Sequence, residues 1–161
     1  MPRLLREIVI GAPPEAVFAF LAQPERLPEW TPGVVSVKRT SPGPVGVGTT
    51  TEAVVEAFGI RQTLLGRCLA FEAPCRLAVQ NVTASGFSVA GVRIGQVSTT
   101  SASELLPEGT GTRLRALLDY AVSAGFLTTM AEAAIKPQMQ ADFDRSLVNL
   151  KRLLESRPAG G

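Results

Sequence analysis

The chain has 161 residues, 45% of them hydrophobic, and a formal net charge of +2, which fits one globular domain with a single core. Its basic residues are scattered and form no runs, so the charge pattern gives little support to nucleic-acid binding. The chain has no histidine and only two cysteines, Cys68 and Cys75, which are too few for a disulfide framework. We therefore expect no metal site and no cofactor.

The N-terminal segment MPRLLREIVIG contains neither a long apolar run nor a small-residue cleavage site, so it is not typical of a signal peptide. No stretch of about 18 apolar residues predicts a membrane span. We expect a cytoplasmic protein with one domain over residues 1–155 and a flexible tail over residues 156–161.

In chain order, the first predicted element is a strand over residues 4–10, where three β-branched residues stand together. The proline pair at 13–14 opens a short helix, because proline suits the first turn of a helix, and Pro24 ends it. A second helical turn over residues 24–27 leads to Trp30, the only tryptophan.

The region from residue 34 to residue 123 is rich in β-branched residues, interrupted by turns that contain Gly and Pro. Gly91 and Gly95 predict bulges in its longest strand. Because the connections are short, we expect antiparallel neighbours. The strands predicted in this region cover residues 34–39, 49–58, 61–71, 77–82, 87–105 and 112–122.

The last segment, from about residue 125 to residue 155, predicts one long amphipathic helix. Apolar residues recur in steps of three and four along it, and polar residues lie between them. Pro137 predicts a kink or a joint. The apolar stripe consists of Ile135, Met139, Phe143, Leu147, Leu150 and Leu154.

Five short motifs follow one another along the chain: APPEAVFAFLAQPERLPEW at 12–30, GVGT at 46–49, FEAPCRL at 71–77, GTRL at 111–114 and LVNLKRLLE at 147–155. With the predicted order of elements, these motifs resemble the START-like (SRPBCC) domains, the superfamily of polyketide cyclase/dehydrase and lipid-transport proteins that includes the birch-pollen-allergen fold. The resemblance covers nearly the whole chain. The third motif departs from the usual pattern, since Cys75 stands where the family usually has a second proline.

The resemblance implies an α+β helix-grip fold: a seven-stranded curved antiparallel sheet around a long C-terminal helix, with two short helices after the first strand. It also implies an internal cavity. It does not imply a reaction, because the shared motifs belong to the scaffold. A fully packed core is the alternative to the cavity.

Strand parity predicts which side chains face the helix. In the last strand Leu118 and Tyr120 share one face with apolar residues, whereas Arg113 and Arg115 share the other. Burying two unpaired arginines would be costly, so the apolar face must point inward.

The third strand follows the same rule and turns Glu52 and Glu56 to solvent, which points Val55 inward. The inner wall is therefore expected to be small and mostly apolar, built from Ala, Val and Thr with one Tyr.

Each predicted ligand-binding residue also has an ordinary structural interpretation. Trp30 could plug the space between the short helices and the sheet, the Tyr120 hydroxyl could bind a water or a carbonyl, and the methionines could be core. Arg93 could face solvent, as could Arg67, or it could bind a carboxylate or enolate. The predicted set is Trp30, Val55, Phe87, Arg93, Leu118, Tyr120, Met130, Met139 and Phe143.

Three functions are compatible with these features. The first is a monomer or homodimer that binds a hydrophobic small molecule, such as a fatty acyl, isoprenoid or aromatic polyketide compound. The second is an aromatic polyketide cyclase or dehydratase that works by positioning, with Tyr120 and Arg93 polarising a carbonyl. The third is a protein-interaction domain. We predict no catalytic residue, because histidine is absent and Cys68 has no visible activating partner, and we leave open whether the protein is an enzyme.

Overall fold

The computed structural model describes residues 2–57, 59–84, 87–89 and 92–156, with residues 87–89 and 92–94 described by their backbone only. Strands and helices follow the predicted order. They are β1 (Arg3–Ile10), α1 (Pro14–Leu21), η1 (Pro24–Glu29), β2 (Val34–Arg39), β3 (Thr50–Ala57), β4 (Ile60–Glu72), β5 (Arg76–Thr83), β6 (Phe87–Val89), β7 (Val92–Glu108), β8 (Gly111–Ser123), η2 (Gly125–Leu127) and α2 (Thr128–Glu155).

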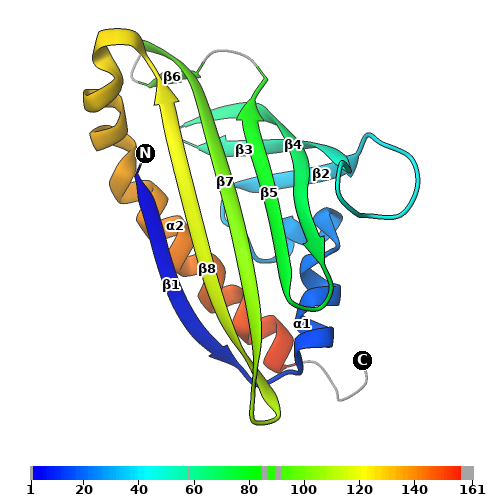
Figure 1. The fold of residues 1–161 in the computed structure, drawn as a ribbon. Coiled ribbons are helices and arrows are strands. Elements are labelled where there is room, and N and C mark those ends of the chain that lie inside the picture. Colours follow the sequence, from blue (N-terminus) through cyan, green and yellow to red (C-terminus); the bar gives the residue numbers. More distant parts are fainter. Residues whose placement is uncertain (1, 58, 85–86, 90–91, 157–161) are drawn as a thin grey trace.

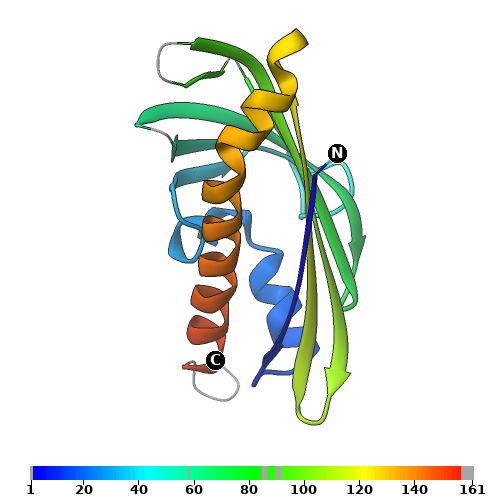
Figure 2. The ribbon, with the colours of Figure 1, turned by 90° about the vertical axis from the view of Figure 1, so that its left-hand side faces the viewer.

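The strands form one curved antiparallel sheet in the order β1-β8-β7-β5-β4-β3-β2, with β6 paired to β7 (Figure 1). Helix α2 lies along one face of this sheet, with α1 and η1 beside it (Figure 2). This arrangement confirms the predicted helix-grip fold with its two short helices and long C-terminal helix.

The long strand predicted over residues 87–105 is two strands, β6 and β7. Their register shifts where Phe87 pairs with Gly95 and Ser88 with Arg93, which confirms the bulge predicted at Gly95. Gly91 and Phe58, predicted as a second bulge and as a strand end, lie outside the described residues, as do residues 157–161 of the predicted tail.

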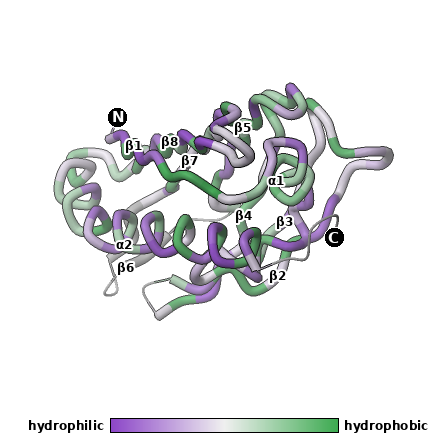
Figure 3. The backbone as a smooth tube through the Cα atoms, turned by 90° about the horizontal axis from the view of Figure 1, so that it is seen from below, coloured by the Kyte–Doolittle hydropathy of each residue, from purple (hydrophilic) through white to green (hydrophobic). Residues whose placement is uncertain are grey.

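Helix α2 is continuous through Pro137. Its first turns, drawn in yellow, lean away from the line of the remaining helix in Figure 2. Hydrophilic and hydrophobic segments alternate along it in Figure 3, as in an amphipathic helix. Among the described helices, none has the length and apolar character that crossing a membrane requires.

The core consists of two clusters, one near each end of α2. The first gathers side chains of β1, α1, β8 and the end of α2, including Ile10, Phe20 and Leu150. The second joins Leu4 and Tyr120 to the beginning of α2 at Ala131 and Ile135. Between Ile135 and Leu147, no residue of α2 belongs to either cluster of buried residues.

Polar contacts fasten α2 to β1. Arg6 Nε donates to Asp144 Oδ1 at 2.7 Å, and Lys151 Nζ donates to the Val9 carbonyl. Glu155 Oε2 accepts from the Gly11 amide at 2.8 Å and from Lys151 at 2.7 Å. These bonds lower the pKa of Glu155, chiefly through the Lys151 hydrogen bond and then through the Gly11 amide.

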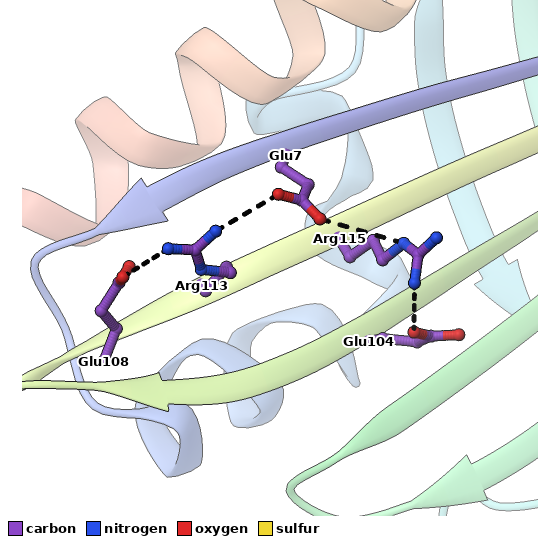
Figure 4. Close-up of polar contacts among 5 residues, drawn as sticks. All are labelled: Glu7, Glu104, Glu108, Arg113 and Arg115. Atoms are coloured by element: carbon purple, nitrogen blue, oxygen red, sulfur yellow. Dashed lines mark hydrogen bonds and ion pairs between the residues drawn. The ribbon is translucent and has the colours of Figure 1, made fainter.

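A chain of ion pairs covers the outer face of β1, β7 and β8 (Figure 4). Arg113 Nη2 lies 2.5 Å from Glu108 Oε1, and Arg113 Nη1 lies 3.4 Å from Glu7 Oε2. Arg115 Nε lies 4.0 Å from Glu7 Oε1, and Arg115 Nη1 lies 3.9 Å from Glu104 Oε2. Both arginines are therefore outside, as strand parity predicts, and the inner face of β8 is left to uncharged side chains.

We expect Gly95→Ala to lower the free energy of unfolding by at least about 2 kcal/mol in urea denaturation. Gly95 has a φ of +80°, and an added Cβ would lie 1.7 Å from the Ser123 carbonyl oxygen. Gly46→Ala is the control, because no atom lies within 4 Å of its Cβ position. Equal stability of both variants would contradict the bulge.

We expect Glu155→Gln to destabilise the fold at pH 7 by no more than about 1 kcal/mol, because solvent screens a surface pair. The pKa of Glu155 is lowered in the fold, so its contribution is present above the unfolded pKa of about 4.3 and is lost as the pH falls through the folded value. Thermal unfolding at pH 7 and pH 3 should show the difference from wild type shrinking in acid. Glu72→Gln, which breaks only a 4.0 Å surface pair with Arg76, is the control and should leave the thermal stability unchanged at both pH values.

Candidate ligand-binding site

A pocket of about 320 Å³ lies between the inner face of the sheet and the middle of α2. Its helix wall runs along α2 from Met139 to Leu150, so it reaches into the first core cluster at Leu147 and Leu150. Most of the lining is apolar. Apolar side chains around it include Leu21, Leu27, Trp30, Val34, Val37, Val55, Leu64, Leu77, Val79, Leu118, Met139, Phe143 and Leu147.

The pocket exists because the sheet offers short side chains where α2 would otherwise pack. Ala53 and Ala116 lie on this wall, and β7 contributes Ser101 and Ser103. Such residues remove volume from a core without bringing the helix closer, since the two clusters fix its distance. An empty apolar void costs stability, which a ligand that fills it would restore.

Polar side chains gather on the sheet wall. Thr51 on β3, Asn81 on β5 and Thr99 on β7 line the pocket together with Ser101 and Ser103. No side-chain hydrogen bond ties any of these five to another residue in the part of the chain that the structure describes. All five are half-buried, and because they line the pocket they can bind what occupies it.

The polar groups on the helix wall are largely occupied. Asp142 Oδ1 accepts from Gln138 at 2.8 Å, and Ser146 Oγ donates to the Asp142 carbonyl at 2.7 Å. Asp142 also borders a second, open hollow that contains Arg61 and Arg145, so this carboxylate stands where the pocket meets the surface.

The wall near Trp30 is held in place by α2. Asn149 Nδ2 donates to the Trp30 carbonyl at 3.1 Å, which links the segment after η1 to the helix. Trp30 is partly buried against the first core cluster and lines the pocket. The single tryptophan of the chain is therefore a spectroscopic reporter at this site.

Five predicted binding residues line the pocket: Trp30, Val55, Leu118, Met139 and Phe143. Val55 and Leu118 are inward-facing, as parity predicts.

The remaining predicted residues do not join them. Tyr120 faces inward but is buried in the second core cluster, outside the lining. Met130 is 70% exposed, which corrects its predicted place in the helix wall: it precedes the buried Ala131 by one residue, a rotation of about 100° around the helix. Phe87 and Arg93 were also predicted, and their side chains lie outside the described part.

Sequence reasoning missed Asn81, Asp142 and the hydroxyls of β7. The signal was present for β7, because Thr99, Ser101 and Ser103 alternate with period two and must share one face. For Asn81 the strand pairing was needed, since only the register shows that it stands beside Thr99.

The structure also shows the surroundings of Arg67 and Cys68, the two other residues that the sequence analysis considered. Arg67 is exposed, which agrees with its solvent-facing interpretation. Cys68 is buried, its Sγ donates to the Ala70 carbonyl at 3.4 Å, and burial raises the pKa of its thiol. A raised thiol pKa disfavours the thiolate, so Cys68 is poorly suited to act as a nucleophile.

The chain is similar to a described protein family over nearly its whole length. The family described as "Polyketide cyclase / dehydrase and lipid transport" matches residues 1–155. No curated protein matches the chain.

Similar solved structures share the fold at low identity. TTHA0849 from Thermus thermophilus is 22% identical with a TM-score of 0.70, and the match covers 97% of this chain and 100% of that one. Ara h 8.0201 is 16% identical with a TM-score of 0.66, covering 97% and 99%. The di-domain ARO/CYC BexL from the BE-7585A biosynthetic pathway is 17% identical with a TM-score of 0.62, covering 94% of this chain and 46% of that one.

We expect Tyr120, the only tyrosine, to ionise above its usual pKa of 10.0. Burial raises the pKa first, and the negative charge of Glu132 adds to it. A raised folded pKa means that the contribution of Tyr120 to stability is present below pH 10 and is lost as the pH rises through the folded value. Absorbance at 295 nm during alkaline titration measures this directly. Ionisation at or below pH 10 would contradict the burial of this ring.

Proposed function

Because the chain belongs to the polyketide cyclase/dehydrase and lipid transport family, which matches residues 1–155, we propose that its pocket binds a hydrophobic small molecule. The observation that carries the proposal is the 320 Å³ pocket, lined mainly by apolar side chains, between a helix and a sheet that are packed together at both ends. Pockets of this kind suit small organic ligands.

The energetics support binding without a charged anchor. A ligand that buries about 200 Å² of apolar surface gains about 5 kcal/mol at 25 cal/mol per Å², before the entropy cost of association. Met139 and Phe143 offer an adaptable thioether and a flat ring to such a ligand. The expectation of a monomer or homodimer in the cytoplasm stays a prediction.

A second candidate is the cyclisation of a polyketide chain held in the same pocket, and the polar sheet wall favours it. Hydroxyls and an amide could orient the carbonyls of a reactive chain. Tyr120 is a poor polarising group for this chemistry, since it lies outside the lining. A carrier would release its ligand unchanged, whereas a cyclase would release a product of altered mass or ring structure, which mass spectrometry and NMR distinguish.

We expect Val79→Trp to weaken ligand binding at least tenfold, because Val79 lines the pocket and an indole there fills it. The matched control is Gln80→Trp, an exposed neighbour on the opposite face of β5, which should bind as wild type does. Native mass spectrometry identifies co-purified compounds, and quenching of Trp30 fluorescence or a shift of the melting temperature measures affinity for a lipid and aromatic library. The fluorescence of the added indole is avoided by using the melting temperature for both variants.

The binding proposal fails if wild type shows neither a co-purified mass nor a shift with any compound. It also fails if Val79→Trp and Gln80→Trp bind equally well while both remain folded by circular dichroism.

A further inference from the structure

The unpaired polar side chains on the sheet wall form a row. The register pairs Thr51 with Gly66, Gly66 with Asn81 and Asn81 with Thr99, so these residues stand side by side on β3, β4, β5 and β7. Adjacent strands are about 4.8 Å apart, so the row crosses about 14 Å of the wall. A ligand lying across the strands would meet all three polar side chains.

Gly66 shows that two of these side chains converge. It lies in the interior of β4 and is buried, with no left-handed backbone to explain a glycine. A Cβ added there would lie 2.3 Å from Thr51 Oγ1 and 2.7 Å from Asn81 Oδ1. Both oxygens therefore lean over the glycine from either side, and the missing Cβ provides their space.

The row has hydrogen-bonding capacity that the described part of the protein leaves unused. Thr51, Asn81 and Thr99 make no side-chain hydrogen bond there, and neither do Ser101 and Ser103. An amide offers both donors and an acceptor, and each hydroxyl offers a donor and acceptor sites.

Most of the other polar side chains in the lining already have hydrogen-bond partners within the described part of the protein. Asp142 accepts from Gln138, Ser146 donates to the Asp142 carbonyl, and Thr49 accepts from the Gly46 amide. Thr31 Oγ1 is an exception, buried near Trp30 without a partner among the described residues.

We propose that the row formed by Thr51, Asn81 and Thr99 selects a ligand that carries hydrogen-bonding oxygen atoms on the edge facing the sheet, such as an oxygenated ring compound, over a plain hydrocarbon or fatty acyl chain. This inference rests on the proposed function and names the ligand class for the same pocket. The apolar face of such a ligand lies against Met139 and Phe143 on α2.

The physical reason is the cost of dehydrating the row. A hydrocarbon that fills the pocket strips water from these groups and returns no hydrogen bond, whereas an oxygenated ligand replaces the water. Loss of one hydrogen bond from such a site lowers affinity about tenfold. The row thus penalises the wrong ligand as well as binding the right one.

The experiment compares two isosteric probes, 2,7-dihydroxynaphthalene and 2,7-dimethylnaphthalene, with laurate as the chain probe, by isothermal titration calorimetry. We expect wild type to bind the diol at least about tenfold tighter than the dimethyl compound. The variant Thr51→Val/Asn81→Leu/Thr99→Val should lose at least about tenfold in affinity for the diol and none for the dimethyl compound or laurate. Substitutions of the same kind on the outer face of the same strands, Gln80→Leu and Thr100→Val, are the control and should keep the wild-type preference.

Each outcome decides. If the dimethyl compound and laurate bind wild type as tightly as the diol, or if the triple variant keeps the preference, the row does not select and the inference is overturned while the binding proposal stands. An equal loss for all probes assigns the row a structural role only and also overturns the inference. If no probe binds wild type, the inference is overturned, and if the library also gives no shift, the binding proposal has failed as well.

Two further variants guard against a fold defect. Thr51→Val/Thr99→Val leaves Asn81 in place and carries the same test if the triple variant does not fold. Gly66→Ala keeps every polar group but forces Thr51 and Asn81 to move, so it should reduce diol affinity several-fold and leave laurate unaffected. Unchanged diol binding in both variants would contradict the proposal.

Discussion

Helix α2 is packed against the sheet through apolar side chains near its two ends, and the rest of the molecule depends on this arrangement. Leu150 and Leu154 belong to one cluster, and Ala131 and Ile135 to the other. Each large buried side chain contributes roughly 1.5–3 kcal/mol, which offsets the cost of leaving the middle unfilled. The same apolar stripe thus acts as core at its ends and as pocket wall at Met139 and Phe143.

Charge is kept away from this interior. Arg113, Arg115 and their carboxylate partners pair on the outer face, and Arg3 pairs with Asp119 at 2.7 Å near the start of β1. Such pairs contribute little individually because solvent screens them. Their larger effect is on orientation: a strand that carries arginines on one face can bury only the other, so they fix which face of β8 meets the helix.

The sequence predicted the fold well because the fold follows from local periodicity. Steps of three and four residues defined α2, and alternation along β8 gave the inward face correctly. The sequence did not predict which inward-facing residues line the pocket, because alternation along a strand shows which face a side chain is on but not how far along the sheet the pocket extends. Tyr120 therefore points inward yet lies in the second cluster, and Asn81 could not be linked to Thr99 before the register of β5 and β7 was known.

The neutral interior limits how this pocket can discriminate among ligands. Among the described lining residues only Asp142 and the Cys68 thiol can ionise, and Asp142 stands where the pocket meets the surface. Ion pairing is therefore not available deep in the pocket as a source of specificity. What remains is shape, together with neutral hydrogen bonds whose value comes mainly from the cost of leaving them unmade. An evenly apolar pocket could not separate two compounds of equal size, whereas a wall with unpaired hydroxyls and one amide can.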